Sequence, residues 1–190
     1  GLGGLALSTV SLAPARAQKL EKPSIRLAVA NKAHLYYLPV TLAERRGHFK
    51  DYGLTVTLAD FEGGSQSLDA LLAGNVDVAT AAYEHTLHAQ ARVQDIRALI
   101  ELGGFPGIVL AVRKDLPFKS HADLKGLKIG VTAPGSSTRY FVLYRMTKAG
   151  LTPADATFVG VGGGPAAAAA LKSGEIDAIS NLDPVITRLP

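Results

Sequence analysis

The 190-residue chain carries 20 Lys and Arg against 16 Asp and Glu, and 47% of its residues are hydrophobic. This composition is typical of a globular protein with room for one large domain or two small ones, and it excludes a disordered chain. The formal net charge of +4 is scattered along the chain, without the basic stripe that a nucleic-acid surface needs. The absence of cysteine excludes a disulfide framework, a thiolate metal site and a cysteine nucleophile.

The N-terminal stretch GLGGLALSTVSLAPARAQ is apolar, rich in small residues, and contains Ala15-Arg16-Ala17. An A-x-A pattern after such a stretch is typical of a signal-peptidase cleavage site. It predicts that residues 1–17 are the back half of a secretory signal peptide, without its Met and basic segment, and that the mature chain begins at Gln18. The alternative is a disordered or helical N-terminal arm. The favoured interpretation is an exported protein of the bacterial periplasm or the outer cell surface.

Strand and helix patterns alternate through the first half of the chain. They predict a strand at 24–30, a helix at 36–49, a strand at 53–61, a helix from 63 to 74, a strand at 76–82, a helix through 85–91, and strands at 96–102 and 107–113. Gly47 and Gly74 are placed to end two of the helices. This order predicts an α/β fold with a parallel sheet and right-handed crossovers.

The second half of the chain repeats the first. GGSQSLDALLAGNVDVAT (63–80) and GGPAAAAALKSGEIDAIS (163–180) are identical at six of eighteen positions. In chain order, this half predicts a short helix at 120–126, a strand at 127–133, a helix at 135–150, a strand at 156–162, a helix from 163 to 174 and a strand at 176–180. The sequence therefore predicts two similar α/β lobes, 24–104 and 105–190, joined through the flexible segment 103–107.

Two such lobes predict a binding cleft. Ligands of parallel α/β sheets lie beyond the carboxyl ends of the strands, where the next helices begin. Helix N-termini offer unpaired amides and a positive dipole end, and glycines there allow close approach of the backbone. We expect the lobes to present these ends on both walls and to close by a hinge motion.

Four stretches together resemble a known family. GLTVTLADFEGGSQSLDALLAGNVDVA, RKDLPFKSHADLKGLKIGV, GVTAPGSSTRYF and LKSGEIDAISNLDPV are similar to substrate-binding proteins of ABC transporters, of the nitrate/sulfonate/taurine type. The resemblance covers nearly everything from Ser24 onward. It implies a type II periplasmic binding-protein fold, no cofactor, and a monomer that delivers a small, anionic solute to an inner-membrane permease. It also implies a later return segment that completes the first lobe, which we expect to lie beyond Pro190.

The strongest candidate ligand residues follow the strand at 127–133. Gly135, Ser136, Ser137 and Thr138 begin a predicted helix and could offer hydroxyls and amides to an anion. One of the hydroxyls could instead serve only as the helix N-cap, although capping and binding are compatible. Gly64 and Ser65 hold the equivalent place in the first lobe. A third helix start, at Gly163-Gly164, is expected to bind an anion less well, because Pro165 has no backbone N–H to donate.

Further candidates follow the other strands. They are His34, Tyr36 and Tyr37 after the first strand, Tyr83 and Glu84 after the third, and Asn181 and Asp183 at the matching place in the second lobe. The tyrosines could equally pack the helix against the sheet. Glu84 would favour a ligand with an ammonium group over a bare anion, or would be a solvated charge at a helix start. The repeated Asp77 and Asp177 are interpreted as structural caps and left out of the site.

Two other functions were weighed against transport. A thiamine-pyrimidine synthase shares this superfamily but depends on a cysteine-rich motif, so we expect no enzyme and no catalytic residues. The effector lobes of a LysR-type regulator share the architecture, but such a protein carries an N-terminal helix-turn-helix where this chain has an export signal. His85 and His88, three residues apart, are only weak evidence for a metal. The sequence does not identify the solute.

Overall fold

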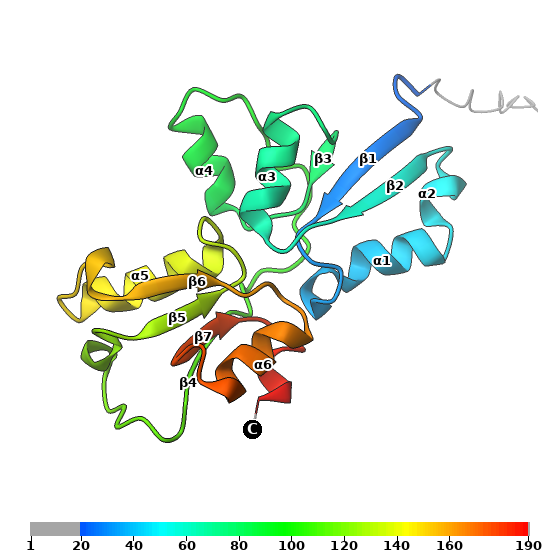
Figure 1. Cartoon of the computed structure of the whole chain (residues 1–190). Helices are drawn as coiled ribbons and strands as arrows, with labels where there is room; N and C mark the ends of the chain where they lie inside the picture. The colour runs from blue at the N-terminus through cyan, green and yellow to red at the C-terminus, as the bar shows by residue number, and fades with distance from the viewer. Residues whose placement is uncertain (1–19, 190) are drawn as a thin grey trace, which may run out of the picture.

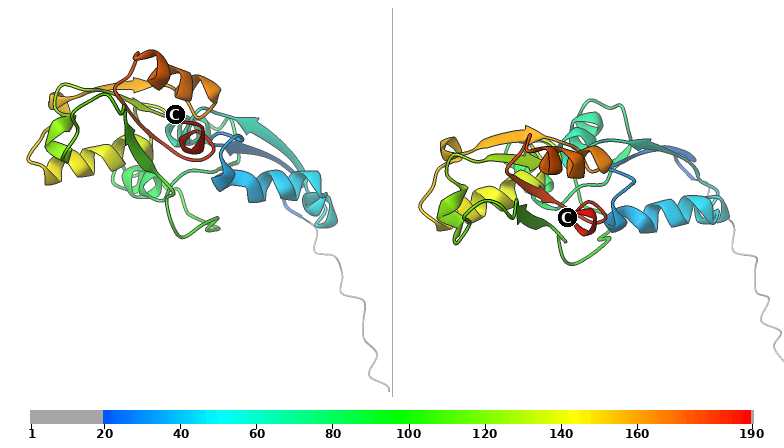
Figure 2. Two further views of the ribbon diagram at one scale, coloured as in Figure 1. Left: turned by 90° about the horizontal axis from the view of Figure 1, so that it is seen from below. Right: turned by 60° about the horizontal axis from the view of Figure 1, so that its bottom comes forward.

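The computed structural model describes residues 20–189, which form two α/β lobes, each built on its own sheet (Figure 1). The helices and strands of lobe 1 lie within residues 24–90, and those of lobe 2 lie within residues 109–188. The turned views in Figure 2 keep the lobes side by side. The predicted signal-peptide remnant, 1–17, lies outside the described residues.

Lobe 1 follows the predicted order of elements. Its elements are β1 (Ser24–Val29), α1 (Leu38–Arg45), α2 (His48–Asp51), β2 (Thr55–Asp60), α3 (Gly64–Leu72), β3 (Val78–Ala79) and α4 (Glu84–Gln90). The three strands are parallel, in the order β2-β1-β3. Gly47 follows the C-cap of α1 with a φ of +79°, which confirms it as the residue that ends this helix.

Lobe 2 repeats this arrangement and adds one strand. Its elements are β4 (Val109–Val112), β5 (Lys128–Val131), α5 (Ser137–Lys148), β6 (Thr157–Gly160), α6 (Pro165–Ser173) and β7 (Ala178–Asn181). The strand order is β4-β7-β5-β6; β5 pairs in parallel with β6 and β7, whereas β4 runs antiparallel to β7. The expected parallel sheet is thus a mixed one here. Short 3-10 turns cover Leu35–Tyr37, His121–Leu124, Pro153–Asp155 and Ile186–Arg188.

The repeat extends to the strand register and to one side chain in each lobe. Arg26 on β1 pairs with Thr57 on β2, and Lys128 on β5 pairs with Thr157 on β6. The Asp77 carboxylate accepts a hydrogen bond from the Arg26 amide at 2.7 Å, and the Asp177 carboxylate accepts one from the Lys128 amide at 2.9 Å. Both aspartates therefore fix the start of a central strand, which confirms their structural interpretation.

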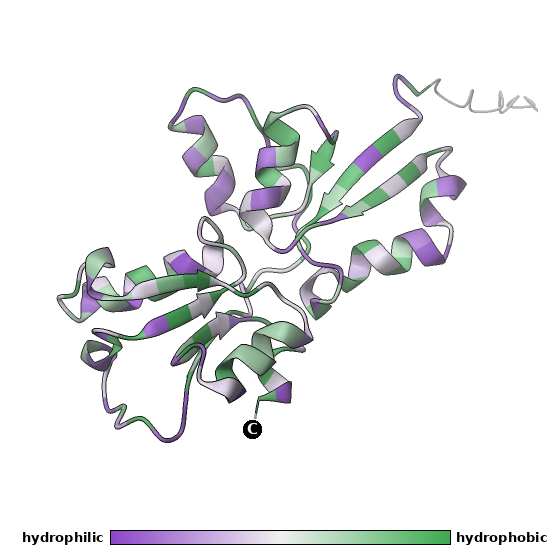
Figure 3. Ribbon diagram, in the orientation of Figure 1, coloured by the Kyte–Doolittle hydropathy of each residue, from purple (hydrophilic) through white to green (hydrophobic). Residues whose placement is uncertain are grey.

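Each sheet is covered by helices on both faces, and the hydrophobic residues concentrate along the strands and the inner helix faces (Figure 3). In lobe 1, Val29 packs with Val40 of α1, whereas its neighbour Ala28 packs with Ala70 of α3. In lobe 2, the α5 face and the α6 face form two further clusters. Neighbouring residues of a strand thus pack on opposite faces of the sheet, as the alternation of side chains along a strand predicts. No helix within residues 20–189 combines the length and apolar character that crossing a membrane requires.

The predicted strand at 96–102 is wrong. The segment is irregular, and its apolar side chains Leu99 and Ile100 are 77% and 82% exposed. Alternating apolar residues form a strand only where a neighbouring strand accepts their backbone hydrogen bonds. In the described part of the chain, the lobe 1 sheet contains β2, β1 and β3, and none of these strands pairs with this segment.

Candidate functional site

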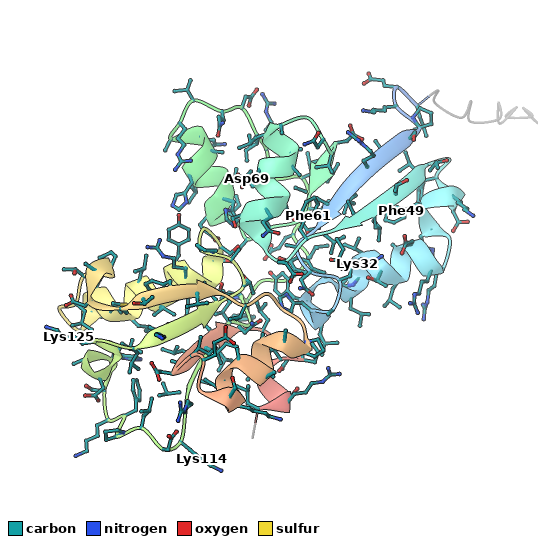
Figure 4. The ribbon with its side chains drawn as sticks, in the orientation of Figure 1. Lys32, Phe49, Phe61, Asp69, Lys114 and Lys125 are labelled. Carbon is teal, nitrogen blue, oxygen red and sulfur yellow. The ribbon has the colours of Figure 1, made fainter. Side chains whose placement is uncertain are left out.

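The carboxyl ends of the parallel strands, β1–β3 in lobe 1 and β5–β7 in lobe 2, point toward the junction between the lobes, whereas the antiparallel β4 runs away from it (Figure 1). The loops after β1, β2 and β3 therefore meet the loops after β5, β6 and β7. Figure 4 shows Lys32 and Phe61, which follow β1 and β2, at this junction, whereas Lys114 and Lys125 of lobe 2 lie away from it. Most predicted ligand residues lie in these loops or in the first turns of the helices that follow them.

The first contact between the lobes joins the starts of α3 and α5. The Ser65 amide donates to Ser136 Oγ at 3.2 Å, and the two hydroxyls are 3.0 Å apart. Ser136 occupies the N-cap position of α5, but its side chain caps no amide of that helix. A Cβ on Gly63 would lie 2.7 Å from Ser136 Oγ, so this approach requires glycine. The structure thus brings together two predicted residues 71 positions apart in sequence.

The other residues of this predicted cluster differ in their surroundings. Thr138 is buried, and its hydroxyl accepts a hydrogen bond from the Thr132 amide at 3.1 Å, so it is engaged inside lobe 2. Gly135 lies against Ser65, because a Cβ there would be 3.1 Å from the Ser65 Cβ. Ser137 is half-buried and is the first residue of α5. Ser137 is therefore the residue of the cluster with which the anion hypothesis can be tested without breaking a hydrogen bond.

The second contact joins the loop after β1 to the end of β7. His34 Nε2 lies 3.2 Å from Asn181 Oδ1, and both side chains are buried. Asn181 Oδ1 also accepts from the Leu182 amide, and Asn181 Nδ2 donates to the Gly162 carbonyl, so Oδ1 is an acceptor and His34 Nε2 carries the proton. The Leu35 amide donates to the carbonyl of Asp183 at 3.1 Å.

Burial of His34 has an electrostatic consequence. Desolvation lowers the pKa of the imidazole below its ordinary value of 6.5, and the hydrogen bond to Asn181 opposes this shift. The imidazole is therefore neutral at pH 7. A Cβ on Gly163 would overlap the His34 ring, which makes this glycine necessary for the observed contact.

The predicted tyrosines occupy three different environments. Tyr37 is 7% exposed and belongs to the core cluster of lobe 1, which agrees with its packing alternative, and burial raises its pKa. Tyr36 is half-buried, and its hydroxyl donates to the carbonyl of Gly103 at 2.7 Å. Tyr83 is 65% exposed. Tyr36 and Tyr37 contact each other edge to face, with ring centroids 5.3 Å apart.

Glu84 lies beside His85, whose three-residue spacing from His88 is only weak sequence evidence for a metal site. Glu84 Oε1 is 3.7 Å from His85 Nε2, and both atoms are buried without a hydrogen-bond partner. A Cβ on Gly64 would lie 2.9 Å from His85 Nε2, so the imidazole rests against the start of α3. Burial lowers the pKa of His85 below 6.5. Within residues 20–189, no group of three His, Cys, Asp or Glu side chains is placed to hold a metal ion.

Two hollows lie where the loops meet. A cavity of about 20 Å³, room for roughly one water molecule, lies beside Ala33, Gly163 and Gly164. An open groove of about 450 Å³ runs outside it along α6, with Glu62 and Glu175 in its lining. Ser65 and Ser136 already bind each other, so a solute placed between these two residues would have to separate the two lobes.

Comparisons with known proteins agree with this geometry. The family model described as NMT1/THI5 like matches residues 34–188. A protein of Bordetella bronchiseptica RB50 has 53% sequence identity and a TM-score of 0.87, over 90% of this chain and 54% of that one. The alkanesulfonate-binding protein SsuA from Xanthomonas axonopodis pv. citri, bound to MOPS, has 25% identity and a TM-score of 0.65, over 88% and 57%. The fold is that of the type II periplasmic binding proteins.

A curated relative has an enzymatic name. The chain is 30% identical over 142 residues to the 4-amino-5-hydroxymethyl-2-methylpyrimidine phosphate synthase of Schizosaccharomyces pombe. The alignment covers 75% of this chain and 40% of the yeast protein. The chain thus spans less than half of this relative and about half of the Bordetella protein.

Proposed function

The chain belongs to the NMT1/THI5-like family, and we propose that it is a solute-binding protein that delivers a small, anionic solute to an ABC importer. The proposed place of action is the periplasm, the proposed macromolecular partner is the permease in the inner membrane, and the protein works as a monomer. The proposed lobes are 24–104 and 105–190. SsuA, a structural neighbour, is described as alkanesulfonate-binding, which supports a sulfonate, taurine, nitrate or similar anion as the solute.

The observation that carries this proposal is the meeting of two helix starts from different lobes at Ser65 and Ser136. A helix N-terminus stabilises a nearby anion by about 0.3–1 kcal/mol, or about 2 kcal/mol when partly buried. Each charge-assisted hydrogen bond adds roughly 1.5–3 kcal/mol. Micromolar affinity requires about 8.2 kcal/mol beyond the entropic loss of capture, so one helix start is too weak. Two helix starts together with side chains from both lobes supply the required order of magnitude.

The binding cycle follows from the contacts between the lobes. The solute enters when the lobes separate, and its anionic group then takes a place between α3 and α5, where the Ser65 amide and Ser136 hydroxyl now bind each other. The buried His34–Asn181 contact holds the closed form on the other side of the junction. The proposed ligand residues are Ser136, Ser137, Thr138, Gly135, Gly64, Ser65, His34, Tyr36, Tyr37, Tyr83, Glu84, Asn181 and Asp183. Thr138 and Tyr37 are buried, so within this set they support the wall of the binding site and do not contact the solute directly.

The second candidate function is pyrimidine synthesis, favoured by the 30% identity to the yeast synthase. The 190 residues contain no cysteine, whereas the synthase family uses a cysteine-rich motif, and this supports binding without turnover. Recovery of the bound solute chemically unchanged after incubation with the protein is expected. Conversion of the solute would support the enzyme.

Ser137→Asp tests the anion site. Aspartate suits a helix start as well as serine does, so the thermal melt should stay close to that of the parent. A carboxylate at this place would repel a bound sulfonate or carboxylate, so calorimetry should find that anion binding is lost. His121→Asp is the matched control, because it places the same charge at the first residue of another helical turn of lobe 2 and should leave binding unchanged. Unchanged binding by Ser137→Asp would contradict the proposal.

A further inference from the structure

Six buried side-chain atoms of the described residues have no hydrogen-bond partner within the protein, and two of them belong to neighbouring residues after β3. These two are Glu84 Oε1 and His85 Nε2, which lie 3.7 Å apart, beyond hydrogen-bonding distance. The His85 side chain is only 5% exposed. Buried polar atoms are nearly always hydrogen-bonded in folded proteins, because a buried atom without a partner loses the hydrogen bonds that it would make with water. The pair therefore indicates a missing partner.

The position of the pair connects it with the proposed anion site. His85 Nε2 lies against Gly64 at the first turn of α3, at a place where a Cβ would come within 2.9 Å. The next residue, Ser65, makes the contact with Ser136 of lobe 2. The two unpartnered atoms thus lie at the same end of α3 as the proposed anion.

The charge of the pair specifies the chemistry of the missing partner. Glu84 is an acid in a partly buried place, and its neighbour His85 is kept neutral because burial lowers the pKa of the imidazole. Among residues 20–189, no Lys or Arg forms an ion pair with Glu84, and Lys32 at the junction is paired with Glu44 instead. A carboxylate without a cation would repel a bare anion placed at the start of α3. It would bind a group that donates N–H hydrogen bonds.

We propose that the solute carries an amino or ammonium group, bound by Glu84 and His85, on the same molecule as the anionic group held between α3 and α5. This inference rests on the proposed function and narrows the solute to amino-bearing anions, such as aminosulfonates, amino acids without a bulky side chain, or aminopyrimidine phosphates. Glu84 accepts hydrogen bonds from the nitrogen, and His85 Nε2 is its second partner. Bare anions such as nitrate bind poorly.

Matched pairs of solutes that differ in the nitrogen test this inference. The pairs are taurine and ethanesulfonate, β-alanine and propionate, and an aminopyrimidine phosphate and its counterpart without the amino group. Calorimetry on the purified protein should find that the amino member of at least one pair binds about tenfold or more tightly than its counterpart, as one charge-assisted hydrogen bond predicts. Glu84→Gln should abolish this preference. Asp51→Asn, which removes an exposed charge on α2, should preserve it.

The outcomes separate the inference from the proposed function. If ethanesulfonate, propionate or nitrate binds as tightly as the amino compounds, the function stands and the inference fails. The inference also fails if Glu84→Gln keeps the preference for the amino member. If no member of any pair and no nitrate binds the parent protein, the proposed anion-binding function is contradicted, and the inference falls with it. A melt of Glu84→Gln close to that of the parent establishes that lost preference does not arise from unfolding.

Discussion

Lobe 1 and lobe 2 repeat one chain path but fill it with different side chains. At the same register position of the two sheets, lobe 1 pairs Ala28 with Ala79, whereas lobe 2 pairs Gly130 with Ile179. A Cβ on Gly130 would overlap the Ile176 side chain, so the small residue on β5 makes room for larger ones around it. The repeat therefore preserves the backbone geometry, whereas the sizes of individual side chains differ.

The residues that join the lobes differ in the same way. His34 lies four residues after Ala30, and Ser136 lies four residues after Thr132, at equivalent places after β1 and β5. Each crosses to the other lobe, His34 to Asn181 and Ser136 to Ser65. Equivalent backbone positions thus supply a titratable imidazole on one side and a hydroxyl that does not titrate near neutral pH on the other. The duplication determines where the junction lies, and the local residues determine its chemistry.

The largest expected effect is on the core of lobe 2. Ile179 is fully buried on β7, so Ile179→Ala should lower the free energy of unfolding by about 2–5 kcal/mol, measured by urea unfolding. The matched change in lobe 1, Ala79→Gly, removes one methyl group from a partly buried place and should have a smaller effect. Equal losses in the two variants would contradict the difference in packing between the lobes.

A smaller effect is expected at the junction itself. Gly163→Ala would place a Cβ against the His34 ring and 2.8 Å from Asn31 Nδ2, so the lobes should no longer close fully. Small-angle scattering should then report a larger radius of gyration, and solute affinity should fall. Gly164→Ala is the control, because a Cβ there meets nothing within 4 Å. If both variants scatter like the parent, the His34–Gly163 contact does not define the closed form.

Much of this architecture could be predicted from local patterns, because each element depends on its own residues. The repeat, the helix starts at Gly64 and Ser136, and the structural role of Asp77 all follow from spacing along the chain. Pairing partners depend on chain segments far apart in sequence. The strand expected at 96–102 and the antiparallel pairing of β4 could therefore not be judged from alternation alone.

In the candidate site too, the positions of residues along the chain could be predicted, whereas their contacts could not. The sequence placed His34, Asn181, Ser65 and Ser136 at strand ends, but it could not predict which of them contact each other across the junction. His85 was missed because its signal is contact with Gly64, a residue 21 positions earlier. A buried imidazole against a helix start becomes recognisable only when the packing of α3 and α4 is known.

The smallest expected effect is a pH dependence that belongs to lobe 1. Burial lowers the pKa values of His34 and His85 below 6.5 in the folded protein, so the unfolded chain binds more protons as pH falls through 6.5. Stability is therefore fully present above this pH and decreases toward the lower folded pKa values. The carboxylates Asp60 and Glu62 near His34, and Glu84 and Asp69 near His85, oppose the shift, whereas His88 adds to that of His85.

Urea unfolding at pH 7.5 and pH 5.5 measures this dependence. Asp77, whose pKa lies below 3.8 because of the Arg26 amide and Lys22, loses its contribution only at lower pH and does not interfere. The parent should be less stable at pH 5.5, and His85→Gln should reduce the difference between the two pH values. His48→Gln, at an exposed position on α2, should leave the difference unchanged. Because Ser136 has no ionisation in this range, Ser136→Ala should also leave it unchanged, even if it weakens the junction. A parent protein equally stable at both pH values would contradict the neutral, buried state of the two lobe 1 histidines.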